Sequence, residues 1–112
     1  MNEFVYLYRR SATPTAPSPQ QMQERMQRWS TWLKELEKKG HVVSIGHPLE
    51  AAGAVATDKG TVSDGPYAET KDIVIGYSLI RASSLAEASA LAAGCPVFDQ
   101  NGTVEVRAVM KM

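Results

Sequence analysis

The segment 63–72, SDGPYAETKD, holds the densest group of residues in this chain whose types could do chemistry. Asp64 would suit general acid–base chemistry at the rim of a sheet cavity, because desolvation there would raise the pKa of its carboxyl group. The same residue also suits a turn, in which its side chain accepts a backbone hydrogen bond and Gly65 relieves backbone strain. Spacing alone favours the turn and leaves the acid–base role open.

The other residues that could take part in reactions are two histidines and one cysteine. His47 ends a β-prone run beside Gly46, at an expected sheet edge where an imidazole could shuttle protons near neutral pH. His41 opens the same run, so the two rings are expected at opposite ends of one strand, and no ligand cluster completes a metal site. Cys95 has no basic neighbour, which favours an inert buried thiol over a nucleophile. The chain also lacks a glycine-rich phosphate loop, and we expect neither metal nor cofactor.

Composition limits the class of protein further. The 112 residues are 44% hydrophobic, enough for one domain with a core, which we expect to span residues 1–112. Twelve basic and twelve acidic residues cancel, which argues against a nucleic-acid partner, since phosphate binding depends on Lys and Arg. No leader pattern and no apolar run of membrane length are present, so we expect no membrane contact and a cytoplasmic location.

Hydrophobic periodicity predicts four main strands and two helices that must position these residues. The strands are expected at 3–9, 41–47, 72–82 and 103–110, the helices at 19–39 and 84–94, and a small hairpin within 49–62. Capping boxes open both helices, at Ser18 with Gln21 and at Ser84 with Glu87. In the first helix Met22, Met26, Trp29, Leu33 and Leu36 form one apolar stripe, which predicts packing against the core or an interface.

The order of elements, β-α-β-hairpin-β-α-β, predicts an α+β class: a ferredoxin-like βαββαβ sheet with both helices on one face. In the strand 72–82 we expect the more apolar alternating set to face the helices. That set is Ile73, Ile75, Tyr77 and Leu79, and the other set is Val74, Gly76, Ser78 and Ile80. The second sheet face is too apolar to leave to water, which predicts a homodimer that packs two such faces around a partly polar cavity.

Three strings in the sequence, DGPYAETK, IGYSLIRASSLAEASALAAGCP and GTVEVRAV, resemble the DGPF domain family of YCII-related proteins. The resemblance extends over nearly the whole chain, with Tyr67 where phenylalanine is usual and Ala108 where proline is usual. It implies a dimeric α+β barrel and a pocket near the DGP string. It also implies a catalytic histidine–aspartate pair, but the histidine would fall at or near Trp29, so the pair cannot be transferred to this chain.

Three functions remain open at this point. One is a protein that binds a small polar molecule in a dimer cavity lined by Asp64. Another is an enzyme of the same geometry, with Asp64 as general base and His47 or Arg107 as its partner. The third is a regulatory protein, since the resemblance links such proteins by genomic neighbourhood to extracytoplasmic-function sigma factors. The other residues expected to line the ligand cavity are Gly65, Pro66, Tyr67, Glu69, Thr70, Lys71, Tyr77, Glu105 and Arg107.

Overall fold

The computed structural model of the chain describes residues 1–11, 17–65 and 72–112, and for residues 61–65 it describes the backbone alone. The main elements are β1 (Asn2–Ser11), α1 (Pro19–Lys38), β2 (Val42–Ser44), β3 (Gly53–Thr57), β4 (Gly60–Gly65), β5 (Asp72–Ala82), α2 (Leu85–Leu91) and β6 (Thr103–Ala108). Two short 3₁₀ helices, η1 (Ala92–Gly94) and η2 (Pro96–Gln100), join α2 to β6. The predicted order of elements is therefore confirmed.

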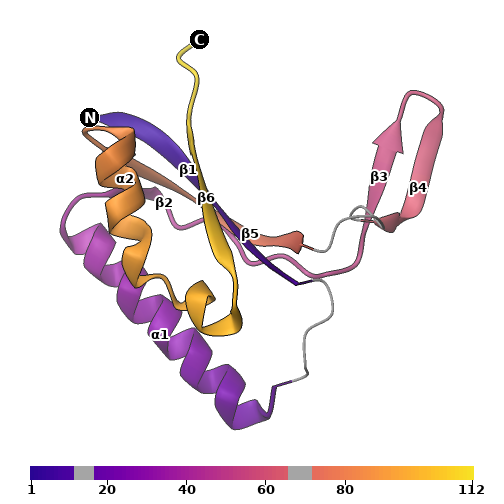
Figure 1. Ribbon diagram of the computed structural model, residues 1–112, viewed down its shortest axis with the longest axis horizontal. Coiled ribbons are helices and arrows are strands. Elements are labelled where there is room, and N and C mark those ends of the chain that lie inside the picture. Colours follow the sequence, from indigo (N-terminus) through magenta and orange to yellow (C-terminus); the bar gives the residue numbers. More distant parts are fainter. Residues whose placement is uncertain (12–16, 66–71) are drawn as a thin grey trace.

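The four main strands form one sheet in the order β2-β5-β1-β6, with antiparallel neighbours throughout. Tyr6 in β1 shows that α1 and α2 cover the same face, because its ring stacks on Trp32 of α1 and its hydroxyl donates to the Ala88 carbonyl of α2. Figure 1 shows both helices beside the crossing strands. This arrangement confirms the predicted α+β class and is consistent with a ferredoxin-like fold.

The core lies between the sheet and the two helices. Its side chains from the sheet include Phe4, Tyr6 and Ile80, and those from the helices include Trp32 and Leu36. The predicted capping box at the start of α1 is present, with the Gln21 N–H donating to the Ser18 hydroxyl at 3.2 Å and the Gln21 side chain accepting from the Ser18 N–H. Among the described residues, no helix combines the length and apolar character needed to cross a membrane.

The prediction for the two faces of β5 is right for Ile73, which is buried, but wrong from Gly76 onward. Gly76, Ser78 and Ile80 are buried under the helices, whereas Tyr77 is 38% exposed on the other face. The cause is a bulge: Tyr8 pairs with Gly76 but Arg9 pairs with Val74, so β5 contains one extra residue at this point. A bulge exchanges the two faces of a strand, and a strict period of two cannot be carried through it.

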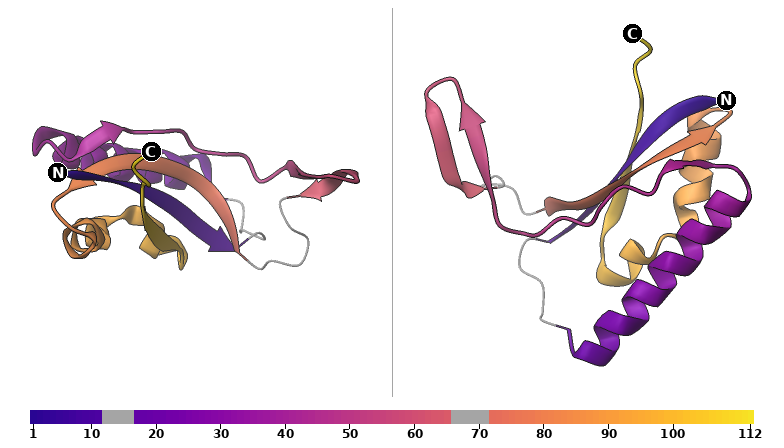
Figure 2. Two further views of the ribbon diagram at one scale, coloured as in Figure 1. Left: turned by 90° about the horizontal axis from the view of Figure 1, so that it is seen from above. Right: turned by 180° about the vertical axis from the view of Figure 1, so that it is seen from behind.

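The predicted hairpin is present as β3 and β4, which pair from Gly53 with Gly65 to Thr57 with Gly60. It projects away from the sheet and the helices in Figure 1 and in both views of Figure 2. β4 extends through Gly65, so the backbone of Asp64 lies in a strand, where the sequence favoured a turn. The rest of the DGP string, residues 66–71, lies outside the described residues.

Candidate functional site

A pocket of about 350 Å³ lies on the helix side of the sheet, between the N-terminal half of α1 and the segment 45–48. Its volume is within the range of small-molecule sites. We call it the α1 pocket. Its described lining residues are Tyr8, Met22, Arg25, Met26, Trp29, Leu33, Ile45, Gly46, His47, Pro48, Ile75, Gly76, Tyr77 and Ser78.

The segment 45–48 is held against β5 by main-chain hydrogen bonds. The Tyr77 N–H donates to the His47 carbonyl at 3.4 Å, and the Leu49 N–H donates to the Ile75 carbonyl at 2.8 Å. Glycine at position 76 favours this close approach, because a Cβ there would lie 3.2 Å from the His47 carbonyl oxygen and 3.4 Å from Pro48. Gly76 therefore lets the segment 45–48, which carries His47, lie directly against β5.

Below this wall, a buried hydrogen-bond chain joins the sheet to the segment 45–48. The Tyr8 hydroxyl donates to the Ser78 hydroxyl at 2.7 Å, and the Ser78 hydroxyl donates to the Ile45 carbonyl at 2.7 Å. Burial raises the pKa of Tyr8 well above its ordinary value, so its proton stays in place at neutral pH. The chain fixes the floor of the pocket and satisfies polar groups that burial would otherwise leave unpaired.

Aromatic and sulfur-containing side chains from α1 form the opposite wall of the pocket. The Trp29 ring meets the Tyr8 ring edge to face, with 4.7 Å between centroids. Met22 and Met26 line the pocket with 52% and 69% exposure, so the N-terminal half of the predicted stripe does not reach the core. The C-terminal part of the stripe behaves as predicted, with Leu36 buried and Leu33 packed against the core.

His47 is exposed at the rim of the α1 pocket, and its ring contacts the Tyr77 ring edge to face at 6.1 Å between centroids. The other histidine, His41, lies at the far end of β2, where its Nδ1 is 2.9 Å from the Arg81 carbonyl oxygen. No group of three His, Cys, Asp or Glu side chains within the described ranges is arranged to hold a metal ion. Cys95 is buried, which raises the pKa of its thiol to about 12 and keeps it protonated.

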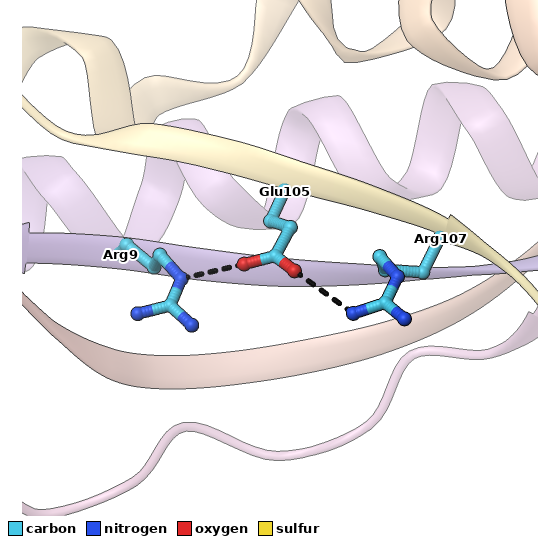
Figure 3. Close-up of polar contacts among 3 residues, drawn as sticks. All are labelled: Arg9, Glu105 and Arg107. Atoms are coloured by element: carbon cyan, nitrogen blue, oxygen red, sulfur yellow. Dashed lines mark hydrogen bonds and ion pairs between the residues drawn. The ribbon is translucent and has the colours of Figure 1, made fainter.

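A second polar group lies on the sheet face that the helices leave open. The Arg9 Nε donates to Glu105 at 2.8 Å, and an Arg107 nitrogen donates to the other Glu105 oxygen at 3.3 Å (Figure 3). These hydrogen bonds, first the one from Arg9 and then the one from Arg107, lower the pKa of Glu105. The group carries a net positive charge, and Arg9 was not predicted because it lies in a strand expected to be structural.

The candidate residues with described side chains lie at the α1 pocket and on the open sheet face, on either side of β5 or along it. His47 and Tyr77 border the α1 pocket, whereas Glu105 and Arg107 pair with each other on the open face. Tyr77 belongs to the same cross-strand row as Leu7 and Glu105, so its side chain lies on the open face of the sheet with theirs. Asp64 and Gly65 belong to the hairpin strand β4. The remaining candidates, Pro66, Tyr67, Glu69, Thr70 and Lys71, lie outside the described residues.

Sequence reasoning missed the α1 side of the pocket, although a signal was present. Arg25 follows Met22 by three residues and precedes Trp29 by four, so it lies on the apolar side of the helix. A charged residue within an apolar stripe is unusual for a face that packs on a core. Trp29, at or near which the family resemblance implied a histidine, lines the pocket.

Fold and pocket together define a ferredoxin-like α+β domain with a cavity between its first helix and the segment after its second strand. The family model for the YCII-related domain matches residues 4–112, and the chain belongs to that family. No curated protein matches the sequence.

Among solved structures, the chain is similar to 5-chloro-2-hydroxyhydroquinone dehydrochlorinase (TftG) from Burkholderia phenoliruptrix AC1100, in complex with 2,5-dihydroxybenzoquinone. The TM-score is 0.51 at 18% sequence identity, and the match covers 98% of this chain and 95% of that one. At this identity the similarity establishes the shared fold, in agreement with the strand order described above.

Proposed function

We propose that this YCII-related protein binds a small molecule in the α1 pocket. The pocket itself supports the proposal most directly: a cavity of about 350 Å³, walled by apolar side chains and reached by few polar ones. The bound 2,5-dihydroxybenzoquinone of the similar dehydrochlorinase is a small planar ring compound, and a ligand of that size suits this volume. The sequence suggested a polar ligand beside Asp64, whereas the described lining favours one with a substantial apolar surface.

Blocking the pocket tests this proposal. Ile45→Trp places an indole in the cavity, and Leu49→Trp is its matched control, because the two residues are 45% and 46% exposed but only Ile45 lines the pocket. We expect small ring compounds to shift the amide NMR signals of residues 45–48 and 75–78 in the wild type and in Leu49→Trp. In Ile45→Trp the affinity should fall by about tenfold or more, the result of losing about 1.4 kcal/mol of contact. Equal affinities in all three proteins would contradict the proposal.

A second candidate function is catalysis in the same pocket. Its support is the exposed His47 imidazole at the rim, in a fold shared with the 5-chloro-2-hydroxyhydroquinone dehydrochlorinase. His47 would act as proton donor or acceptor, a common role of an imidazole in catalysis. Asp64 stays a predicted general acid or base on the hairpin. If His47→Gln keeps ligand affinity and loses turnover of a bound compound, catalysis is supported; unchanged turnover would exclude the histidine.

We also propose that two copies pack through their open sheet faces, with the Arg9–Glu105–Arg107 group in the interface. The face carries Val5, Leu7 and Leu79, which the isolated chain buries only in part. Leu79→Glu should convert a dimer to a monomer in light scattering at micromolar concentration, because an unpaired buried carboxylate is costly. The control Leu85→Glu, on the exposed side of α2, should stay dimeric. A wild-type monomer at this concentration would refute the arrangement.

A further inference from the structure

Arg25 occupies an unusual place for a charged residue. It extends from the apolar side of α1, one turn from Met22 and Trp29, and it lines the α1 pocket with them. Its side chain is partly buried, and a guanidinium keeps its positive charge at every pH that proteins tolerate. The pocket therefore contains one permanent cation in a mostly apolar wall.

No protein anion neutralises this cation within the described residues. Arg9 and Arg107 each bond Glu105, and Arg28 bonds Asp99, whereas Arg25 has neither an ion pair nor a hydrogen bond there. The described lining of the pocket also contains no carboxylate. A partly desolvated charge without a partner is unfavourable, so an anion that entered the pocket would gain a strong hydrogen bond.

The walls beside Arg25 favour a flat ring. The Trp29 and Tyr8 rings meet edge to face and both line the pocket. Met22 and Met26 line it with Trp29 on the α1 side. Methionine sulfur makes favourable contacts with aromatic rings, and its flexible side chain adapts to ligands of different shape. Ile45 and Ile75 provide an apolar surface against the other side of the ring.

We propose that the α1 pocket recognises a small aromatic carboxylate. The ring lies between the Met22–Trp29 side of α1 and the Ile45–Ile75 side, and the carboxylate accepts two hydrogen bonds from the Arg25 guanidinium. Arginine is suited to this role because its planar fork matches the two carboxylate oxygens. The inference rests on the proposed binding function and names the chemical class of its ligand.

The test compares 2-naphthoate with its neutral isostere 2-naphthamide by isothermal titration calorimetry. Three proteins are titrated: the wild type, Arg25→Gln, and the matched control Arg28→Gln, which removes one positive charge from the same helix outside the pocket. We expect the wild type and Arg28→Gln to bind the acid about tenfold or more tightly than the amide, the difference typical of a charge-assisted hydrogen bond. In Arg25→Gln this preference should disappear, while the affinity for the amide stays the same.

Three outcomes would overturn the inference, and they differ in what they say of the pocket. If the wild type binds acid and amide equally, the anion preference is refuted and the small-molecule pocket stands. If neither compound binds the wild type at millimolar concentration, the binding function fails as well. If Arg28→Gln loses the preference as Arg25→Gln does, the effect reflects net charge and Arg25 has no special role. Arg25→Lys, which keeps the charge and loses the fork, should retain only part of the preference.

Discussion

Replacing Gly46 by alanine is expected to lower the free energy of unfolding by about 3–4 kcal/mol. Gly46 has φ +74°, a left-handed conformation that costs a residue with a Cβ about 1–2 kcal/mol. A Cβ at this position would also lie 1.9 Å from the Tyr77 carbonyl oxygen and 2.8 Å from its carbon. Both atoms belong to the backbone of a central strand, so they cannot move aside as a flexible side chain would.

Gly40 supplies the matched control for this prediction. It has φ +82°, close to that of Gly46, but a Cβ added at Gly40 would meet no described atom within 4 Å. Gly40→Ala should therefore cost only the conformational part, about 1–2 kcal/mol. Urea unfolding of both variants at equal protein concentration isolates the steric part, and equal losses of stability would show that the segment 45–48 moves away from β5 without cost.

The same substitution links stability to the pocket. Gly46 lies between Ile45, whose carbonyl accepts from Ser78, and His47, whose carbonyl accepts from the Tyr77 N–H. Displacing this segment breaks both hydrogen bonds and moves a wall of the α1 pocket. Folded Gly46→Ala should consequently lose small-molecule affinity, whereas Gly40→Ala, outside the pocket lining, should keep it.

The order of elements was predictable from the sequence because most of its local signals agree with the tertiary structure. The Ser18–Gln21 box starts α1 where the pattern placed it, and the Gly60 turn joins the two strands of the hairpin. Such agreement between capping, turn chemistry and periodicity is what allows a chain to specify one arrangement. A strict period of two did not predict which β5 residues face the helices. One extra residue opposite the Tyr8–Arg9 pair reverses the alternation of the two faces.

The candidate site was predictable only in part, and for a different reason. His47 was found because a histidine at the end of a strand is conspicuous. Met22 and Met26 were assigned to the same stripe as Leu36, since periodicity reports which side of a helix is apolar but not where its partner surface ends. The sheet supports only the C-terminal half of α1, so the N-terminal half of the same stripe borders a pocket.

Substitution of each α1 tryptophan should distinguish the part of the helix that packs on the core from the part that borders the pocket. Trp32 is 9% exposed and stacks on Tyr6 at 6.1 Å between centroids, so Trp32→Ala should cost about 3–5 kcal/mol through lost burial and a cavity. Trp29 is only partly buried and contacts Tyr8 from the pocket side. Trp29→Ala should therefore cost clearly less, about 1–2 kcal/mol, because part of its surface already meets water.

Ligand affinity should change in the opposite order. Measured where each variant is folded, 2-naphthoate should bind Trp32→Ala nearly as well as the wild type, since Trp32 lies outside the described lining of the α1 pocket. Trp29→Ala removes the aromatic wall beside Arg25 and should weaken binding about tenfold, which corresponds to roughly 1.4 kcal/mol. If Trp29→Ala instead binds normally and loses as much stability as Trp32→Ala, the apolar stripe packs as a single core surface, and the pocket on α1 does not bind the ring.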